Sequence, residues 1–328
     1  MGDSSSRILI IGAGHLGSRH LQGLCKINRD IKISVIDPSA RALKLCSKRF
    51  KEMKSNPHIV SINYFQKIEE VNSKIDLAIV STTADIRYKV IENLLNRINV
   101  KNFILEKILF QSIIEFGLAK KIFNSNKVKA WVNCSRRMIP FYRKLEQENF
   151  GIKPIKIVVK GDIGIASNSI HMLDLLAFLS KQTEITIDIS KLEKKIYSSK
   201  RSNFVEFKGE LYAHSSRGDS LKIIDKRNNK TDLTISLEND EKLIIINQTK
   251  AIYNLKFKDN HFSSINHPFN TPFQSELTAK QVEQILDTGN SFLPSLEESS
   301  VLHKPMTEAF NFHLSSILNK KILVCPIT

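Results

Sequence analysis

Residues 7–17 read RILIIGAGHLG, and this stretch decides the fold. An apolar run typical of a β-strand leads directly into Gly12, Gly14 and Gly17, which have the spacing GxGxxG. A segment with apolar residues at helical spacing follows. Gly12 permits a tight turn, Gly14 lets the backbone approach a pyrophosphate, and Gly17 allows the helix to pack closely on the strand. A strand, a glycine turn and a helix in this order therefore predict a dinucleotide-binding fold.

The predicted helix after this turn starts with His15 and Leu16. The N-terminus of a helix presents free N–H groups and the positive end of the helix dipole, and both attract phosphate groups. We therefore expect His15 and Leu16 to lie beside the cofactor together with the three glycines.

Asp37 ends the second predicted strand, Lys32–Asp37, and stands 20 residues after Gly17. A carboxylate at this place can accept hydrogen bonds from both hydroxyls of the adenosine ribose and would repel a 2′-phosphate. This favours NAD over NADP. Arg41 lies one helical turn further and could neutralise the repulsion, so NADP stays an alternative.

The first half of the chain alternates strand-like and helix-like segments. Further strands are expected at Ile59–Tyr64, Asp76–Ser81, Asn102–Glu106 and Lys127–Asn133, and helices at Leu16–Ile27, Pro38–Phe50, Ile86–Ile98 and Ile113–Phe123. Such alternation predicts βαβ units and a parallel sheet. We assign residues 1–135 to this dinucleotide-binding Rossmann domain.

The pattern changes in the second half, where short strand-like runs follow one another without long helices between them. Strands are expected at Ile155–Ile163, Ile185–Ile189, Phe204–His214, Ser220–Asp225, Thr231–Leu237, Leu243–Asn247 and Ala251–Phe257, and helices at Asn168–Leu179, Gln274–Thr288 and Leu296–Asn319. This pattern predicts an α+β domain with a mostly antiparallel sheet over residues 136–328. The fold class is therefore α/β with a second, α+β domain.

The net charge of the chain is +16, from 49 Lys+Arg and 33 Asp+Glu, and residues 1–150 carry most of this excess. Such a field attracts polyanions, including phosphate-bearing small molecules. No zinc module, aromatic-rich RNA motif or long basic tail accompanies it, so we expect no specific nucleic-acid partner. No apolar run has the length of a membrane helix. Four scattered cysteines without metal-ligand spacing predict free thiols, a cytoplasmic location and no metal site.

On these motifs, the sequence resembles the Gfo/Idh/MocA family, named after glucose–fructose oxidoreductase, inositol dehydrogenase and a rhizopine catabolism protein. The resemblance covers nearly the whole chain. It implies an N-terminal Rossmann domain, a C-terminal domain with an open, mostly antiparallel sheet, and a homodimer or homotetramer.

The family carries Glu-Lys-Pro after its fifth strand, and this chain has Glu106-Lys107-Ile108 there. The resemblance implies that Lys107 is catalytic and reaches the substrate hydroxyl, and that Glu106 belongs to the cofactor side of the site. A lysine at the carboxyl end of a parallel strand also enters the region where α/β sheets bind ligands. Ile108 takes the place of the family's proline.

A second motif lies in residues 164–176, GIASNSIHMLDLL, where His171 and Asp174 match the family's catalytic positions. Their i,i+3 spacing places both on one face of a helix. His171 is the natural acid/base, because the unperturbed pKa of histidine is about 6.5. Ser167 stands where the family has Asp, and Asn168 follows it. Either side chain could bind a sugar hydroxyl.

Two further sites are implied by the resemblance. Ser81 and Thr82 follow the fourth strand, where the family lines the nicotinamide ribose with small residues. Arg136 follows the sixth strand, where an arginine can face the substrate and hold a phosphate or carboxylate with two hydrogen bonds.

Together, these features predict an NAD(P)-dependent oxidoreductase. We expect it to pass a hydride between nicotinamide and a secondary hydroxyl or keto carbon of a sugar or nucleotide-sugar, in bacterial surface-sugar biosynthesis. The departures at Ile108 and Ser167 leave an alternative, a catalytically silent NAD-binding or regulatory protein of the same fold.

Overall fold

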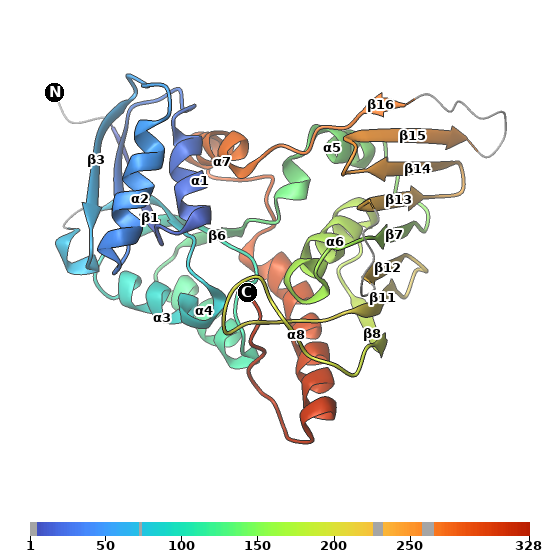
Figure 1. Ribbon diagram of the computed structural model, residues 1–328. Coiled ribbons are helices and arrows are strands. Elements are labelled where there is room, and N and C mark those ends of the chain that lie inside the picture. Colours follow the sequence, from blue (N-terminus) through green and yellow to red (C-terminus); the bar gives the residue numbers. More distant parts are fainter. Residues whose placement is uncertain (1–4, 72–73, 226–231, 258–265) are drawn as a thin grey trace. The chain divides into compact units, whose positions relative to one another are not determined.

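The computed structural model describes residues 5–71, 74–225, 232–257 and 266–328 (Figure 1). Contacts between residues divide the chain into two units. Unit 1 consists of Met1–Phe110, Ile114–Asn133 and Pro272–Glu297, and unit 2 of Gln111–Ile113, Cys134–Thr271 and Glu298–Thr328. The chain thus passes from unit 1 to unit 2 mainly between residues 133 and 134, and Pro272–Glu297 belongs to unit 1 again.

Unit 1 contains a six-stranded parallel sheet in the order β3-β2-β1-β4-β5-β6. Its strands are β1 (Ser6–Ile11), β2 (Ile31–Ile36), β3 (Ile59–Phe65), β4 (Ile75–Val80), β5 (Val100–Leu105) and β6 (Lys129–Val132). Its helices are α1 (His15–Leu24), α2 (Ala40–Lys51), α3 (Ala84–Leu95), α4 (Ile113–Ser125) and α7 (Gln274–Thr288), with a short 3₁₀ turn, η1 (Ile68–Glu70). The central strands are apolar and buried on both faces, as in other parallel sheets covered by helices.

Helix α7 packs against α1 although the two are far apart in the sequence. Gly23 of α1 makes this possible, because a Cβ atom there would lie only 2.7 Å from the Cβ of Thr278 in α7. The absence of a side chain at Gly23 therefore lets the two helices pack closely at this point, and α7 is part of unit 1.

Unit 2 contains an eight-stranded sheet in the order β16-β15-β14-β13-β7-β12-β11-β8. Only β7 and β12 pair in parallel; the other neighbours are antiparallel. The strands are β7 (Lys156–Lys160), β8 (Ile185–Leu192), β11 (Gly209–Ser215), β12 (Ser220–Asp225), β13 (Thr234–Glu238), β14 (Lys242–Asn247), β15 (Ile252–Phe257) and β16 (His267–Pro268). The remaining elements are β9 (Tyr197–Ser198), β10 (Val205–Glu206), η2 (Ser135–Met138), α5 (Pro140–Gln147), α6 (Ile165–Ser180) and α8 (Leu296–Leu318).

Buried and half-buried residues alternate along β12, and α6 packs against this strand. Leu221 and Ile223 are buried, whereas Lys222 and Ile224 between and after them are partly exposed. This is the period of two that a sheet with one covered face requires. The predicted fold class, a parallel Rossmann sheet followed by a mostly antiparallel sheet, is confirmed.

Three predicted segments differ in detail. The expected strand Phe204–His214 is divided into β10 and β11, because Gly209 has a φ of 115° and the chain changes direction there. The expected strand Thr231–Leu237 starts at a residue outside the described ranges and appears as β13. Helix α5 was not expected; Pro140 at its first position suits a helix start.

None of the helices within the described ranges combines the length and the apolar character needed to cross a membrane.

Candidate functional site

The glycine turn after β1 has the geometry that a dinucleotide requires. Gly12 has a φ of 96°, and a Cβ there would lie 3.1 Å from the backbone of Ser81. A Cβ at Gly17 would lie 1.8 Å from the carbonyl oxygen of Gly12, so only glycine lets α1 start this close to the turn. A Cβ at Gly14 would meet no atom within 4 Å. The space in front of Gly14 is therefore open to a ligand.

Helix α1 begins at this opening. No side chain caps its N-terminus, and no acidic residue lies in its first turn. Both features leave its N–H groups and positive dipole end available to an anion. His15 is exposed and Leu16 half-buried at this end. The guanidinium of Arg49, which donates to Ser18 Oγ at 3.1 Å, adds a positive charge beside the turn.

Asp37 follows β2 and connects the second strand to the glycine turn. Its Oδ2 accepts a hydrogen bond from the N–H of Ala13 at 2.7 Å, and its Oδ1 accepts one from the N–H of Ser39 at 2.8 Å. A carboxylate has about four acceptor sites. The half-buried Asp37 can thus bind ribose hydroxyls in addition to these two backbone groups.

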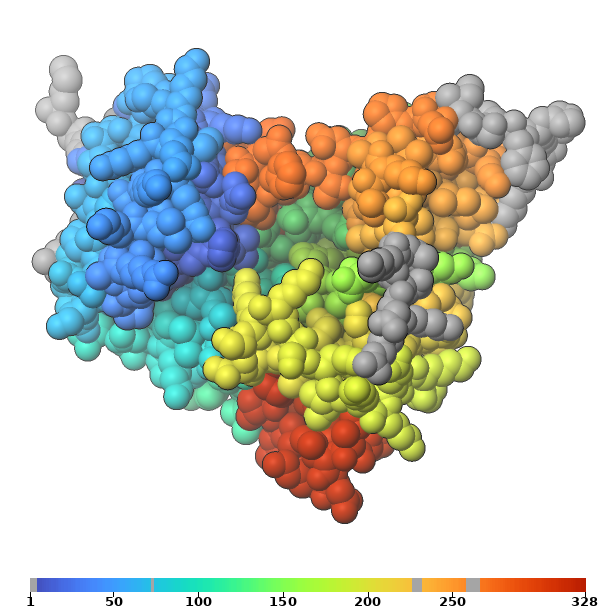
Figure 2. Space-filling model, viewed as in Figure 1, coloured from blue at the N-terminus to red at the C-terminus, as the bar shows by residue number. Residues whose placement is uncertain are grey.

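Arg41 is exposed in the first turn of α2. Lys44, Lys48 and Lys51 are exposed on the same helix, which stands at the surface of unit 1, in blue in Figure 2. This helix carries a basic surface next to the carboxyl end of β2, where the adenosine side of a dinucleotide lies in this fold.

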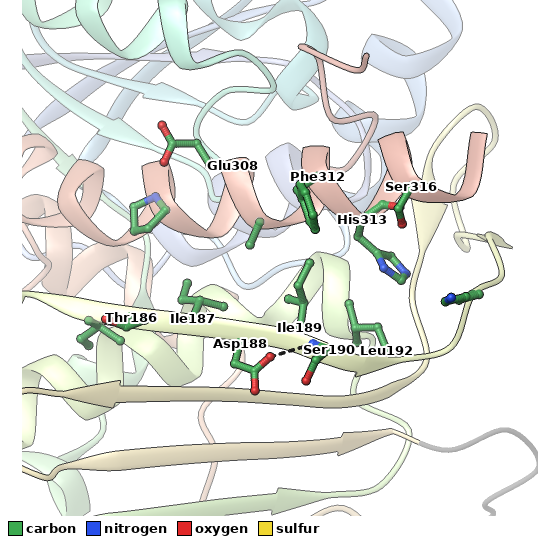
Figure 3. Close-up of a pocket in the computed structure, with 14 residues that line it drawn as sticks. Thr186, Ile187, Asp188, Ile189, Ser190, Leu192, Glu308, Phe312, His313 and Ser316 are labelled. Atoms are coloured by element: carbon green, nitrogen blue, oxygen red, sulfur yellow. Dashed lines mark hydrogen bonds between the residues drawn. The ribbon is translucent and has the colours of Figure 1, made fainter. Parts of the chain in front are cut away.

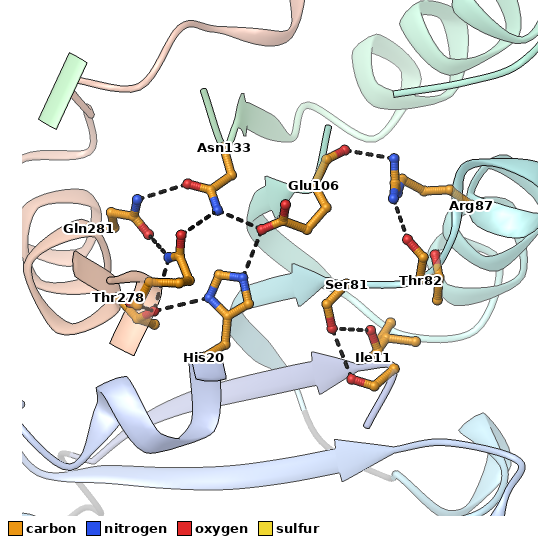
Figure 4. A network of polar contacts seen from close by, with 11 residues as sticks. Ile11, His20, Ser81, Thr82, Arg87, Glu106, Asn133, Thr278 and Gln281 are labelled. Atoms are coloured by element: carbon orange, nitrogen blue, oxygen red, sulfur yellow. Dashed lines mark hydrogen bonds and ion pairs between the residues drawn. The ribbon is translucent and has the colours of Figure 1, made fainter. Parts of the chain in front are cut away.

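Ser81 and Thr82 follow β4, the strand beside β1. The hydroxyl of Ser81 lies within hydrogen-bond distance of the carbonyl oxygens of Ile11 and Gly12, at 3.0 and 2.8 Å, and so fixes the start of the glycine turn (Figure 4). Thr82 Oγ1 is buried and has no hydrogen-bond partner among the described residues. Buried hydroxyls normally have a partner. The orphaned Thr82 hydroxyl and the open space at Gly14 therefore both fit a bound dinucleotide.

Glu106 and Lys107 follow β5. Lys107 is half-buried, whereas the Glu106 carboxylate is buried and accepts hydrogen bonds from His20 Nε2 at 2.8 Å and Asn133 Nδ2 at 2.5 Å (Figure 4). Burial alone would raise the pKa of Glu106, but the hydrogen bonds and charge of His20, with the Asn133 amide and the charge of Arg87, lower it. The peptide bond between Lys107 and Ile108 is cis.

The His20 ring connects this carboxylate to α7. His20 Nδ1 lies 3.0 Å from Thr278 Oγ1, and that hydroxyl lies 3.0 Å from the carbonyl oxygen of Gln274. If the threonine proton points to that carbonyl, both ring nitrogens of His20 donate, one to Thr278 and one to Glu106. This arrangement ties the His20 ring to both Thr278 and the Glu106 carboxylate. The amide groups of Asn133, Gln274 and Gln281 extend the same network.

Helix α6 carries the second group of predicted residues, and Glu206 holds its N-terminus. The Glu206 carboxylate accepts hydrogen bonds from the N–H groups of Ala166 and Ser167 and from Ser167 Oγ, the last at 2.7 Å. Asn168 Nδ2 donates to the carbonyl of Ile163 at 2.6 Å and to Ser167 Oγ at 3.1 Å. Because both amide protons are engaged, Asn168 offers its carbonyl oxygen, a hydrogen-bond acceptor, to any ligand.

His171 and Asp174 lie one turn apart on α6. His171 is half-buried, and Asp174 is fully buried in a two-pronged ion pair with Arg137, with distances of 2.8–3.1 Å. Burial raises the pKa of Asp174 to about 6, although the Arg137 charge acts in the opposite direction. The structure thus gives Asp174 a structural partner, and its catalytic role stays a prediction.

Arg136, next to this pair in η2, is the predicted substrate arginine. Its Nη2 donates to Gln248 Oε1 at 3.2 Å, and the buried Tyr142 hydroxyl lies beside the same guanidinium. A guanidinium has five N–H donors, so it can also bind an anionic or polar group of a ligand.

Sequence reasoning missed His20, Asn133 and Glu206, which hold the predicted residues in place. His20 stands three residues after Gly17 on the buried face of α1, and this spacing could have marked it as facing the sheet. Glu206 had no comparable signal, because it comes from a two-residue strand about 40 residues after α6 begins.

A groove of about 870 Å³ in unit 2 lies between β8 and α8 (Figure 3). Ile187 and Ile189 line it from the strand, and Phe312 and His313 from the helix. No predicted site residue lines this groove. Within the ranges that the structure describes, no three His, Cys, Asp or Glu side chains are grouped to hold a metal ion.

Residues 6–134 match the family model GFO_IDH_MocA, described as "Oxidoreductase family, NAD-binding Rossmann fold". A search of curated proteins finds no match. The matched residues include the glycine turn, Asp37, Ser81, Thr82 and Lys107.

Solved structures share the fold of nearly the whole chain at low sequence identity. A Gfo/Idh/MocA family oxidoreductase from Vibrio cholerae is 16% identical, with a TM-score of 0.69, covering 96% of this chain and 100% of that one. UDP-N-acetylglucosamine 3-dehydrogenase GnnA from Acidithiobacillus ferrooxidans is 13% identical, with a TM-score of 0.66 and coverages of 97% and 99%. An oxidoreductase from Agrobacterium radiobacter in complex with NAD⁺, L-tartaric acid and magnesium is 11% identical, with a TM-score of 0.70 and coverages of 95% and 97%. The resemblance inferred from the sequence is thereby confirmed over residues 6–134, which match the NAD-binding Rossmann fold of the Gfo/Idh/MocA oxidoreductase family, and the whole chain has the fold of a solved member of that family.

Proposed function

We propose that this oxidoreductase transfers a hydride between NAD and a secondary hydroxyl or keto carbon of a sugar or nucleotide-sugar. The observation that carries the proposal is the glycine turn of unit 1, where the space at Gly14 is open and Asp37 is tied directly to the turn. The Asp37 carboxylate favours NAD, and Arg41 keeps NADP as the alternative.

When bound, the nicotinamide ring supplies the hydride chemistry. Gly12, Gly14, Gly17 and the N-terminus of α1 would hold the diphosphate, and Asp37 the adenosine ribose. Ser81 fixes the glycine turn, and the free Thr82 hydroxyl is the group we assign to the nicotinamide ribose.

In this proposal, Lys107 and His171 have different roles at the substrate oxygen. Lys107 orients and polarises the oxygen with its ammonium group, and His171 takes or returns the hydroxyl proton. Asn168 accepts a hydrogen bond from a neighbouring hydroxyl, and Arg136 binds a phosphate or carboxylate where the substrate has one.

The names of similar structures support a sugar-type substrate. They include the dehydrogenase of UDP-N-acetylglucosamine and a putative myo-inositol dehydrogenase from Sinorhizobium meliloti. We extend the proposal to bacterial surface-sugar biosynthesis and to a cytoplasmic homodimer or homotetramer. Light scattering of the purified protein tests the oligomer.

The test is cofactor reduction by a panel of UDP-sugars, inositols and free aldoses. We expect turnover with at least one of them, and a loss of about 10²–10⁴-fold in kcat in Lys107→Ala and in His171→Ala. Lys101→Ala is the matched control, because Lys101 is an exposed lysine on β5 that pairs with Asp76. It should leave kcat unchanged.

The second candidate function is catalytically silent NAD binding. The observation that favours it is the engagement of the Ser167 hydroxyl by Glu206, at the position where the family's aspartate is missing. NAD binding without turnover on any member of the panel would select this candidate.

A further inference from the structure

Arg87 of α3 is a fully buried arginine that binds backbone carbonyls. Its side chain is 1% exposed. Nη1 donates to the carbonyl oxygens of Glu106 at 2.6 Å, Leu109 at 3.0 Å and Ile108. Nη2 donates to the carbonyl of Thr82, and Figure 4 shows the bonds to Glu106 and Thr82. One guanidinium thus gathers three carbonyls from residues 106–109 and one from the loop after β4.

Burying a guanidinium is costly unless its hydrogen bonds are made. A planar group with five donors can meet several acceptors at fixed angles, which a lysine ammonium on a flexible stem cannot do. The carbonyls of Glu106, Ile108 and Leu109 all turn toward Arg87. A rotation of this segment would therefore break several charge-assisted hydrogen bonds at once.

Lys107 lies between the carbonyls that Arg87 binds. Residue 108 is isoleucine, so no proline ring restricts φ at this place, and side-chain hydrogen bonds hold the segment instead. The Glu106 side chain supplies one tie through His20 and Asn133. Arg87 supplies a second tie from the opposite side, through the backbone.

We propose that Arg87 is a positioning residue for Lys107: by binding the carbonyls on both sides of it, Arg87 fixes the direction in which the Lys107 side chain leaves the backbone. The bond to the Thr82 carbonyl also fixes Lys107 relative to the loop that we assign to the nicotinamide ribose. The inference rests on the proposed catalytic role of Lys107. It requires that kcat depends on Arg87 more strongly than the Kd for NAD does, because three of the four carbonyls that Arg87 binds belong to residues 106–109.

The experiment compares Arg87→Lys with the matched control Arg97→Lys. Arg97 follows the same helix, is exposed, and pairs with Glu69 and Asn93. Lysines are dimethylated with ¹³C-formaldehyde, and the Lys107 signal is assigned from the Lys107→Arg variant. Circular dichroism confirms that each variant is folded. Arg87→Met, which lacks every donor, provides a second variant.

We expect the Lys107 methyl resonance to shift or broaden in Arg87→Lys and to stay unchanged in Arg97→Lys. With an active substrate, kcat should fall by about 10–100-fold in Arg87→Lys, while the Kd for NAD changes by less than about threefold. A Lys107 resonance that is the same in the wild type and in both Arg87 variants overturns the inference, as does an unchanged kcat. The Lys107 resonance can be measured without turnover. If the wild-type protein turns over none of the tested substrates, that result therefore contradicts the proposed function but not the effect of Arg87 on Lys107.

Discussion

His20 Nε2 lies 2.8 Å from Glu106 Oε1, and both side chains are buried. The contact joins the helix that carries the glycine turn to the segment that carries Lys107. It therefore couples the predicted cofactor-binding and catalytic parts of unit 1. Since Thr278 and Asn133 complete the hydrogen bonds of the pair, it forms a closed polar unit inside the domain.

Replacing His20 by alanine should destabilise the protein by about 1.5–3 kcal/mol, because the buried Glu106 carboxylate loses one of its hydrogen-bond donors. Urea unfolding followed by the fluorescence of Trp131, the single tryptophan, measures this change. The matched control is His58→Ala. His58 pairs with Asp30 at the same 2.8 Å, but the two side chains are 39% and 57% exposed. We expect the control to cost about 0–1 kcal/mol. Equal losses in the two variants would contradict the assigned role of His20.

Gly14→Ala and Gly17→Ala should separate cofactor binding from folding. A methyl group at Gly14 meets no protein atom, and the φ of −65° there suits alanine. Gly14→Ala should therefore keep its melting temperature within a few degrees but bind NAD at least about tenfold more weakly, since the methyl group occupies the space of the diphosphate. Calorimetric titration with NAD measures the affinity.

Gly17→Ala, by contrast, should impair folding. Its methyl group would lie 1.8 Å from the Gly12 carbonyl oxygen, so the start of α1 must move. We expect a large loss of melting temperature or of soluble protein. Normal NAD affinity in Gly14→Ala would show that the diphosphate does not lie at this turn.

The parallel sheet and the glycine turn were predictable because their signals are local. A strand, three glycines and a helix occupy adjacent residues, and Gly12 and Gly17 stand where a side chain would collide with the backbone. The network around Glu106 was not predictable in this way. Glu106 lies 86 positions after His20 in the sequence, and Thr278 lies 258 positions after it. A buried polar residue gives no periodic signal that would identify such a distant partner. The same holds for Glu206, whose carboxylate reaches α6 from a distant short strand.

Asp37→Asn should shift the cofactor preference toward NADP. Asparagine keeps an oxygen to accept the hydrogen bond from Ala13 but removes the negative charge that repels a 2′-phosphate. A charged hydrogen bond contributes about 1.5–3 kcal/mol, so we expect the Kd for NAD to rise by about tenfold or more. The Kd for NADP should fall.

Arg41→Ala in the Asp37→Asn background tests the partner of that phosphate. It should weaken NADP and leave NAD nearly unchanged, because only NADP carries the extra dianion. The exposed Lys44→Ala serves as the control on the same helix. An unchanged ratio of the two affinities in Asp37→Asn would mean that this carboxylate does not select the cofactor.

The pair of Arg137 and Asp174 gives the sharpest test of the predicted catalytic set. Arg137→Met should destabilise the protein by about 3–5 kcal/mol, because it leaves the buried Asp174 carboxylate unpaired. Asp174→Leu should cost less, because Arg137 keeps its contact with Glu298 at 3.5 Å. The double variant replaces both charges by apolar groups. We expect it to lose much less than the sum of the two single losses, which a double-mutant cycle from urea unfolding measures.

The activity of the double variant then separates two roles of Asp174. If the carboxylate serves only to pair with Arg137, the double variant is folded and keeps most of its kcat, since His171 on the same helix still carries the proton. If Asp174 takes part in the reaction, the double variant is folded but inactive, and its kcat falls as far as that of Asp174→Leu. Because the buried carboxylate is already bound by two guanidinium nitrogens, we expect the first outcome.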